Sequence, residues 1–507
     1  MKKILASLAF LLCLTSFSFA QEEEVFPEFN IEQSEIEFHL RFLASDEMLG
    51  RRTGEQGNEV AARYIAECLR SYGATTPPGH DSYFQDVPLK TVKTAKEGSI
   101  TWGEQTFTHG EDLIVLSGLP FEGEAQAVYA GHGLIDEEAG INDYEGINAE
   151  GKIVFVISGT PGKFDRRKTF RSMAEKRRIA ADQGAVALVE IYKLPFPWDF
   201  FKRYFGRSRM QLDQEATKSA GEMLPYFWVS EGESGLLEAF RAKKPKLKMA
   251  VSSTGTSEEK IISRNVIGVL EGSDPELKDE FIILTAHFDH VGHGTKGGTI
   301  TEEDSIFNGA RDNGIGTAAM LAAAKAFSKK RPRRSVAFIG FTAEEVGLLG
   351  SQWYADNPII PLNKTMCNLN SDGGGYTVTD RVVIYGYDRV NLNVDYDAAA
   401  AKFGLTVSHD PAPEQNLFER SDNASFAKKG VPAPTLSPGF TAFDKEYMTY
   451  YHQVVDNPES LDFPYLVKVC QTFTHIARLL ADADTVPTWV EGDRYEEVGK
   501  ELYGSDK

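Results

Sequence analysis

The second half of the chain alternates short apolar runs with longer amphipathic stretches. Four apolar runs are continuous, without the alternation of a half-solvated strand: NVIGVLEG, EFIILTAHFD, SVAFIGFTAEE and KTMCNLNSDG. Three stretches repeat their apolar residues at helix spacing: GTAAMLAAAKAFSKK, EEVGLLGSQWYA and YLVKVCQTFTHIARLLAD. Continuous apolar strands that alternate with helices indicate strands buried on both faces of a sheet. We therefore expect an α/β fold, with a mostly parallel mixed sheet and helices on both of its faces.

The first half of the chain has a different texture. Residues 31–75 show helix spacing on both sides of a polar, turn-rich loop, ASDEMLGRRTGEQGN. From about residue 115 to 251, short apolar runs such as KIVFVISG and AVALVEIY are separated by turns and by one basic helical stretch. This pattern predicts a compact β-rich module with a few helices. By composition, SSTGTSEEK at residues 252–260 is a linker that follows the module.

An aromatic segment, LPFPWDFFKRYFG, lies inside the β-rich module at residues 194–206. Packing within the module is the favoured interpretation, ahead of a ligand site. A lid over a neighbouring cleft is the alternative.

The first twenty residues have the order of a secretory signal peptide. A positive start, MKK, precedes an apolar stretch and a small-residue cleavage pattern that ends at Ala20. The apolar stretch is short for a membrane span. We expect the chain to be exported, to the periplasm or the medium, with no membrane insertion of the mature chain. The three remaining cysteines, Cys68, Cys367 and Cys470, form no CxxC pair, so we expect buried thiols with at most one disulfide.

Length and charge narrow the classes further. The chain has 507 residues, too many for one typical core, and a formal net charge of −20. A nucleic-acid binder needs a basic footprint, so we expect no nucleic-acid partner. The predicted division is a signal peptide (1–20), the first part of the α/β domain (21–114), the β-rich module (115–251), the rest of the α/β domain (252–485) and a C-terminal tail (486–507).

Residues capable of metal chemistry stand where the predicted strands end. His287 and Asp289 end one apolar run, Glu344 and Glu345 end another, and a third ends at Asp372. Asp312 lies in GARDNG, just before a predicted helix. Ligands bind at the carboxyl ends of strands in α/β sheets, and these side chains are ones that zinc accepts. A single carboxylate there would be explained as a helix cap, but several buried together are costly without a cation.

Five segments in order, HFD, NGARDNG, TAEEVGLLGS, NLNSDGG and YYHQVVDNPE, resemble the signatures of the clan MH di-zinc exopeptidases. The resemblance is closest to secreted leucyl-type aminopeptidases and their glutamate-carboxypeptidase relatives. It implies a zinc exopeptidase fold of the phosphorylase/hydrolase-like kind. The β-rich module, with DYEGINAEGKIVFVISG, resembles the protease-associated (PA) domain insert common in this family.

The resemblance also implies a ligand set for two Zn²⁺ ions per chain. By position, Asp312 bridges both ions, His287 and Asp372 bind one of them, and Glu345 and His452 bind the other. The implied substrates are peptides or small proteins.

Two further roles come from the same resemblance. Glu344 is the implied general base for peptide hydrolysis, and Asp289 is implied to support His287. The bond between Asp312 and Asn313 is implied to be cis. Asp422, in FERSDNASFAKKGVPA, lies in a stretch that resembles a family segment lining the site, without an assigned role.

Several alternatives stay open at this stage. A carboxypeptidase of acidic dipeptides would need a basic pocket, and a glutaminyl-cyclase-like acyltransferase would need one zinc; a non-enzymatic binding protein is a further possibility, disfavoured by the complete donor set. His290 and His293 follow His287 in HFDHVGHG, and we expect them to be solvent-exposed or to line the pocket. No HExxH and no G-x-S-x-G is present, which argues against a single-zinc helix site and a serine hydrolase. The candidates for a basic pocket are Arg311, Arg381, Arg389 and Arg420.

Overall fold

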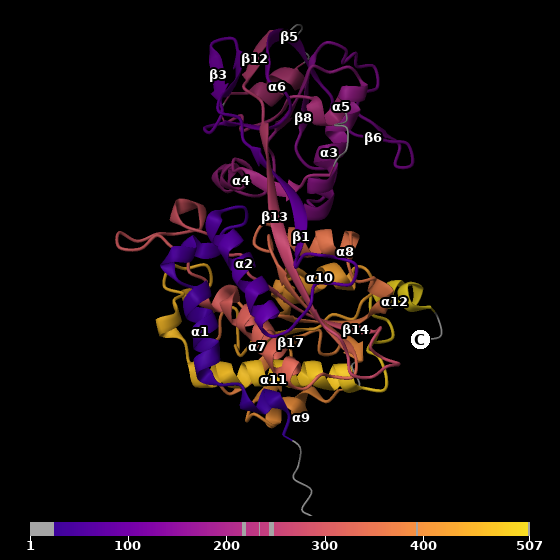
Figure 1. Cartoon of the computed structure of the whole chain (residues 1–507). Helices are drawn as coiled ribbons and strands as arrows, with labels where there is room; N and C mark the ends of the chain where they lie inside the picture. The colour runs from indigo at the N-terminus through magenta and orange to yellow at the C-terminus, as the bar shows by residue number, and fades with distance from the viewer. Residues whose placement is uncertain (1–24, 215–219, 233, 243–247, 392–393, 505–507) are drawn as a thin grey trace, which may run out of the picture.

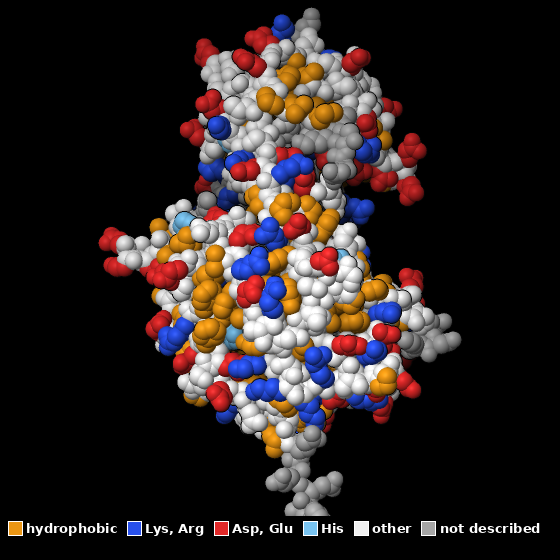
Figure 2. Space-filling model, viewed as in Figure 1, with side chains coloured by type: hydrophobic (Ala, Val, Ile, Leu, Met, Phe, Trp, Pro, Cys, Tyr) orange, Lys and Arg blue, Asp and Glu red, His pale blue; other side chains and the backbone are white. Residues whose placement is uncertain are grey.

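The computed structural model describes residues 25–214, 220–232, 234–242, 248–391 and 394–504 (Figure 1). The predicted signal peptide at residues 1–20 lies outside these ranges. The chain forms two lobes, each built around its own large sheet, and Figure 2 shows the surface narrowing between them.

The larger lobe contains a nine-stranded sheet. Its strand order is β10 (Arg209–Leu212), β1 (Phe84–Lys93), β13 (Ser257–Leu270), β15 (Ser335–Phe341), β14 (Phe281–His287), β16 (Thr365–Ser371), β20 (Thr435–Pro438), β17 (Arg381–Tyr385) and β19 (Thr406–Ser408). The four central strands, β15, β14, β16 and β20, are parallel to one another. Pairing is antiparallel from β10 to β15 and between β20 and β17, and parallel between β17 and β19. The predicted α/β class is confirmed, and the parallel part is the centre of the sheet.

Helices cover both faces of this sheet because its central strands are buried on both sides. Every residue of β14, β15 and β16 is buried, as their continuous apolar runs predicted. One helical layer packs on β14 and β16 and consists of α7 (Ile315–Lys329) and α11 (Phe463–Asp482), flanked by α1 (Gln33–Leu43) and α2 (Gln56–Ser71). The opposite layer contains α8 (Leu349–Asp356) and α10 (Asn423–Ala427). The chain runs from β14 to β15 and then crosses back to β16, so the strand order reverses beside β14. A reversal of this kind is where α/β sheets bind ligands.

The smaller lobe contains an eight-stranded sheet with an apolar core on each face. Its strand order is β3 (Gln105–Thr108), β2 (Gly98–Trp102), β12 (Lys248–Ser253), β5 (Phe121–Tyr129), β8 (Ile153–Ile157), β9 (Ala187–Ile191), β11 (Tyr226–Val229) and β4 (Leu113–Ser117). Its helices are α3 (Arg166–Asp182), α4 (Trp198–Phe205), α5 (Ala220–Met223) and α6 (Leu236–Arg241). The remaining short elements are β6 (Ile135–Asp136), β7 (Ile141–Asn142), β18 (Val390–Asn391), β21 (Thr488–Trp489), α9 (Tyr396–Ala401) and α12 (Glu496–Tyr503).

The sheets divide the chain differently from the expected boundaries. Strands β2 and β3 come before residue 115, yet they pair in the second sheet, where β2 joins β12. Strand β10 lies within the expected insert, yet it pairs with β1 in the main sheet. The predicted linker at residues 252–260 is also wrong at both ends: residues 252–253 end β12, and residues 257–260 begin β13 and pair with β1. These four residues are exposed, so their polar side chains stay solvated while their backbone groups join the ladder. Strands β1 and β13 rise together toward the smaller lobe (Figure 1).

The cysteines agree with the sequence analysis where they are described. Cys68, Cys367 and Cys470 are free, and the last two are buried. No helix in the described ranges combines the length and the apolar character needed to cross a membrane. On the face shown in Figure 2, basic and acidic side chains are interspersed.

Candidate metal centre

The ends of three central strands bring one group of donors together. His287 is the last residue of β14, Asp372 directly follows β16, and Glu344 lies three residues beyond β15. The Nε2 atom of His287 is 3.4 Å from Asp372 Oδ1 and 3.9 Å from Glu344 Oε2. These residues offer donor atoms that lie within 4.8 Å of one another, which is the spacing of a metal site.

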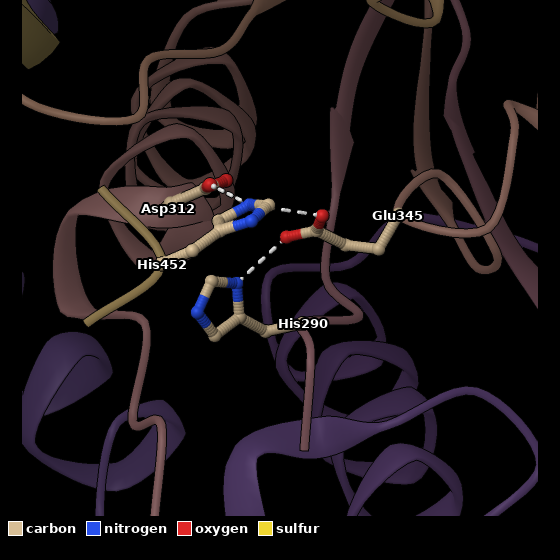
Figure 3. Close-up of side chains that lie close together, drawn as sticks. All are labelled: His290, Asp312, Glu345 and His452. Carbon is tan, nitrogen blue, oxygen red and sulfur yellow. Dashed lines mark hydrogen bonds and ion pairs between the residues drawn. The ribbon is translucent and has the colours of Figure 1, made fainter. Parts of the chain in front are cut away.

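A second group of donors lies beside the first and is drawn in Figure 3. It consists of His290, Asp312, Glu345 and His452. The Nε2 atom of His452 is 3.1 Å from both Asp312 Oδ2 and Glu345 Oε2, while His290 Nδ1 is 2.7 Å from Glu345 Oε1. His452 comes from a loop, where its backbone φ is 54°.

Asp312 is the residue that joins the two groups. Its Oδ1 atom lies 3.5 Å from His287 Nε2, and its Oδ2 atom faces His452. The buried segment Ala310–Gly314 holds it just before α7, and the Asp312–Asn313 peptide bond is cis, as the resemblance implied. The carboxylate of Asp456 accepts hydrogen bonds from the backbone N–H of Arg311, at 2.9 Å, and of Asp312, at 3.4 Å. The loop is therefore fixed through its backbone, so the carboxylate oxygens of Asp312 stay available to bind a cation.

Glu344 and Glu345 stand in a turn and not at a helix start. The sequence pattern predicted a helix from residue 344, but α8 begins at Leu349, and Ala343 and Leu348 both have φ of 61°. The carboxylate of Asp289 accepts hydrogen bonds from the backbone N–H of Glu344, at 3.0 Å, and of Glu345, at 3.3 Å. The two glutamates thus diverge from a turn that a buried carboxylate holds in place.

Asp289 differs in detail from its predicted role. Its carboxylate is 3.8 Å from His287 Nδ1, whereas its backbone carbonyl accepts a hydrogen bond from that nitrogen at 3.2 Å. Support of His287 therefore comes from the main chain of Asp289. The carboxylate also accepts a hydrogen bond from the Thr53 hydroxyl at 2.9 Å, and burial raises its pKa to about 6.

The crowding of carboxylates dominates the electrostatics. Burial alone would lower the pKa of His287, but the charges of Glu344, Asp372 and Asp312 raise it well above its ordinary value. Burial likewise opposes protonation of His452, and the charges of Glu345 and Asp312 raise its pKa to about 11.

The two adjacent glutamates are separated by their surroundings. Burial raises the pKa of Glu344 well above its usual range, and the charges of Glu345 and Asp372 add to that shift. Burial also acts to raise the pKa of Glu345, but His452 and His290 outweigh it and hold that pKa well below its usual range. Carboxyl groups whose environments push their pKa values apart are typical of a division between acid–base and charge-holding roles.

The donor atoms fit a divalent cation better than they fit one another. His452 Nε2 is buried and makes no hydrogen bond among the described residues, although two carboxylate oxygens lie 3.1 Å away. A buried nitrogen aimed between oxygens without hydrogen-bond geometry is the arrangement of ligands around a shared ion. Imidazole and carboxylate donors without any thiolate match zinc chemistry.

The donor residues all lie within a segment that matches a known protein family. Residues 265–477, less than half of the chain, match the model of peptidase family M28. We call this part of the chain the M28 segment. The matched residues contain every donor of both groups, from His287 to His452.

The proteins to which this chain is similar in sequence include a protease and an aminopeptidase. The vacuolar membrane protease of Saccharomyces cerevisiae is 37% identical over 113 residues, which are 22% of this chain and 10% of that protein. Aminopeptidase Y of the same yeast is 27% identical over 239 residues, 44% of this chain and 40% of its own. The chain thus aligns with less than half of the length of these relatives. The solved aminopeptidase from Aneurinibacillus sp. strain AM-1 has the same fold, with a TM-score of 0.57 and 21% identity over 90% of this chain and 96% of that one.

The pocket of the M28 segment opens directly onto the donors. It is a small cavity of about 60 Å³ whose walls include Phe443, Tyr447 and Tyr451. The ring of Tyr451 stacks on that of His452, with centroids 4.1 Å apart. Of the four arginines considered for a basic pocket, Arg420 lines this cavity. The other three are paired with carboxylates of Asp456, Asp380 and Asp493.

The M28 segment also contains site residues whose place the sequence did not reveal. His290 is 1% exposed, contacts Glu345 and does not line the cavity, so the expectation of solvent exposure or pocket lining is wrong for it; His293, by contrast, has about half of its side chain exposed. The HFDHVGHG repeat was the available signal, but a loop has no fixed period that would tell one histidine from the other. Asp422 is fully buried, and burial raises its pKa to about 7. His409 and His475 pair with Asp388 and Glu28, away from the donor groups.

Proposed function

We propose that this protein is a metal-dependent exopeptidase that removes residues from the N-terminus of peptides. The observation that carries the proposal is the position of Asp312, whose two oxygens face His287 on one side and His452 on the other. The M28 match supports hydrolysis of peptide bonds, and aminopeptidase Y among the relatives supports attack at the N-terminus.

The donor set supports binding of two zinc ions. His287 and Asp372 would hold one ion, Glu345 and His452 the other, and Asp312 would contribute one oxygen to each. When bound, such a pair polarises the scissile carbonyl group and makes water acidic enough to react near neutral pH.

Glu344 is the residue placed to move protons. Glu344 lines the cavity beside the donors, and its carboxylate is not part of the second donor group. Its raised pKa makes it a better proton acceptor than an ordinary glutamate. In the proposed reaction Glu344 takes a proton from the attacking water and returns it to the nitrogen of the leaving amine. Asp289 keeps Glu344 in position by accepting a hydrogen bond from its backbone N–H.

The small volume of the cavity, about 60 Å³ with aromatic side chains in its walls, supports cleavage close to a chain end. Carboxylates also outnumber cations around it, which favours a positively charged α-amine over a carboxylate. A carboxypeptidase is the second candidate, supported by Arg420, the arginine that lines the cavity. There its guanidinium would bind the C-terminal carboxylate of the substrate.

We propose further that the mature chain is exported and begins after Ala20. The basis is the order of charged, apolar and small residues in 1–20. Sequencing the N-terminus of the protein recovered outside the cytoplasm tests this step.

The proposed function is tested with metal analysis and a panel of substrates. The purified full mature chain should contain two zinc ions and release amino acids from peptides with a free α-amine. Peptides whose amine is acetylated should be stable, and peptides whose carboxylate is amidated should be cleaved normally. Cleavage of acetylated peptides, together with resistance of amidated ones, would replace the aminopeptidase by a carboxypeptidase.

A further inference from the structure

A second cavity, of about 850 Å³, lies in the smaller lobe, and the proposed peptidase function makes no use of it. Its lining shares no residue with the cavity at the metal centre. Its volume falls within the range of small-molecule sites, which is roughly 300–1,000 Å³.

Two helices form its walls with faces of regular spacing. Helix α3 contributes Arg166, Phe170, Met173, Ala174 and Arg177, which recur every three or four residues along one side. Helix α4 and the residue before it contribute a second such face, which consists of Pro197, Phe200, Phe201, Tyr204 and Phe205. Strands β4 and β11 complete the lining with Leu116, Ser117 and Tyr226. The cavity is therefore a feature of the packing of α3 against α4 and not of a single loop.

The aromatic side chains are divided between packing and solvent. Phe201 is buried and stacks on Trp228, with ring centroids 4.2 Å apart, so it holds α4 on the sheet. Phe200 and Tyr204, on the same face, are 60% and 62% exposed. Large apolar side chains that line a cavity and remain this exposed mark a binding surface.

The charged side chains that line the cavity are three arginines, Arg166, Arg177 and Arg209. The Arg177 Nε atom donates to the backbone carbonyl of Gly221 at 2.9 Å, and its guanidinium also donates to the Ser117 hydroxyl, which fixes its position. Burial lowers the pKa of Arg177, Tyr226 and Glu222 oppose that shift, and the charge of Arg209 makes a smaller contribution to it. Within the described ranges, Arg209 has no carboxylate partner and lies over the ring of Phe205, 5.8 Å from its centroid. An anion bound beside Arg177 and Arg209 would relieve the repulsion between their guanidinium groups.

We propose that this cavity binds a small amphipathic carboxylate, a molecule with one anionic head and an apolar body. The head would lie against Arg209 and Arg177, and the body would extend along the apolar faces of α3 and α4 toward Phe200. A neutral apolar ligand would leave the arginines of the lining without an anionic partner inside the cavity, and a cation would be repelled by them. A charge-assisted hydrogen bond to an arginine is roughly twice as strong as a neutral one, so the head decides which amphiphiles bind.

The test uses two amphiphiles with the same chain and opposite charge. Dodecanoate and dodecyltrimethylammonium, both below their micellar concentrations, are titrated into the full mature protein by isothermal calorimetry. We expect dodecanoate to bind one molecule per chain with micromolar affinity and dodecyltrimethylammonium not to bind. Arg209→Gln should weaken dodecanoate binding at least tenfold. Arg207→Gln is the matched control, because Arg207 is exposed two residues away and does not line the cavity, and it should bind as the parent does.

A second variant fills the space without removing a contact. Ala174→Trp places an indole in the cavity from the exposed side of α3 and should abolish dodecanoate binding. Circular dichroism and thermal unfolding like those of the parent would show that the variant is folded. Three results would each overturn the proposal: no saturable binding of dodecanoate, equal binding by the Arg209→Gln and Arg207→Gln proteins, or equal binding of the two amphiphiles.

Discussion

The Oδ1 atom of Asp289 lies 3.0 Å from the backbone nitrogen of Glu344. This contact ties the loop after β14 to the turn after β15, and the other oxygen of Asp289 does the same for Glu345. One buried carboxylate thus orients the proposed base and a proposed metal ligand together, without touching either side chain.

Replacement of Asp289 tests this positioning role. In Asp289→Asn the amide can accept from one backbone N–H but presents its own donors to the other. We expect kcat to fall about 10- to 100-fold while KM and zinc content stay near the parent values. Thr53→Val removes the hydroxyl that donates to the same carboxylate and should have a smaller effect. Equal activity of Asp289→Asn and the parent enzyme would show that the turn needs no such anchor.

Asp312 should be required for both ions. Asp312→Asn leaves one carbonyl oxygen where two carboxylate oxygens face two histidines, so elemental analysis should find less than one zinc per chain. Glu303→Gln, an acid-to-amide change at an exposed position in the preceding loop, is the matched control and should keep two. Two tightly bound ions in Asp312→Asn would contradict the bridging position.

His290 should act through Glu345. Its Nδ1 atom lies 2.7 Å from Glu345 Oε1, so His290→Gln is expected to weaken zinc binding about 10- to 100-fold, which is typical for a lost partner of a ligand. At saturating zinc, kcat should recover to within a few fold of the parent value. His293→Gln, at the exposed histidine of the same loop, should change neither quantity, and a loss of kcat in His290→Gln that zinc does not restore would assign His290 a direct role.

His39 should make stability depend on pH far from the metal centre. It is fully buried between the hydroxyls of Tyr64 and Tyr72, and burial, with a smaller contribution from Lys325, lowers its pKa from 6.5 to about 4. The unfolded chain therefore binds the proton more readily, so stability is full above pH 6.5 and is lost as the pH falls toward 4. The shift corresponds to about 3 kcal/mol.

The measurement is the melting temperature of the metal-free protein between pH 6.5 and 4. His39→Gln should flatten this dependence, whatever its effect at neutral pH. An unchanged slope in the variant would show that His39 is not the group that titrates.

Much of the site was visible in the sequence because apolar runs end where strands end. His287, Glu344 and Asp372 follow such runs, and the fold places them together at the reversal of strand order. His452 has no such signal, since it stands in a loop with positive φ, and only the resemblance to a family placed it. The position of His290 was predicted wrongly because it also lies in a loop after its strand.

The errors have physical causes of two kinds. EEVGLLGSQWYA has helix spacing, but Gly347 and Leu348 adopt positive φ, so the helix begins only at Leu349. The insert begins near residue 98 because β2 pairs with β12, about 150 residues later, and local patterns carry no record of such pairing. The long strand β13 begins in a polar stretch for a related reason: an exposed ladder needs no apolar side chains.

The most direct test of the proposed function is the turnover of Glu344→Gln measured together with its zinc content. We predict two zinc ions per chain, an unchanged fold and a kcat lowered at least about 100-fold on a peptide with a free α-amine, because the amide cannot accept the proton. A Glu344→Gln enzyme that keeps its zinc and turns over within tenfold of the parent rate would contradict the assignment of Glu344 as the base.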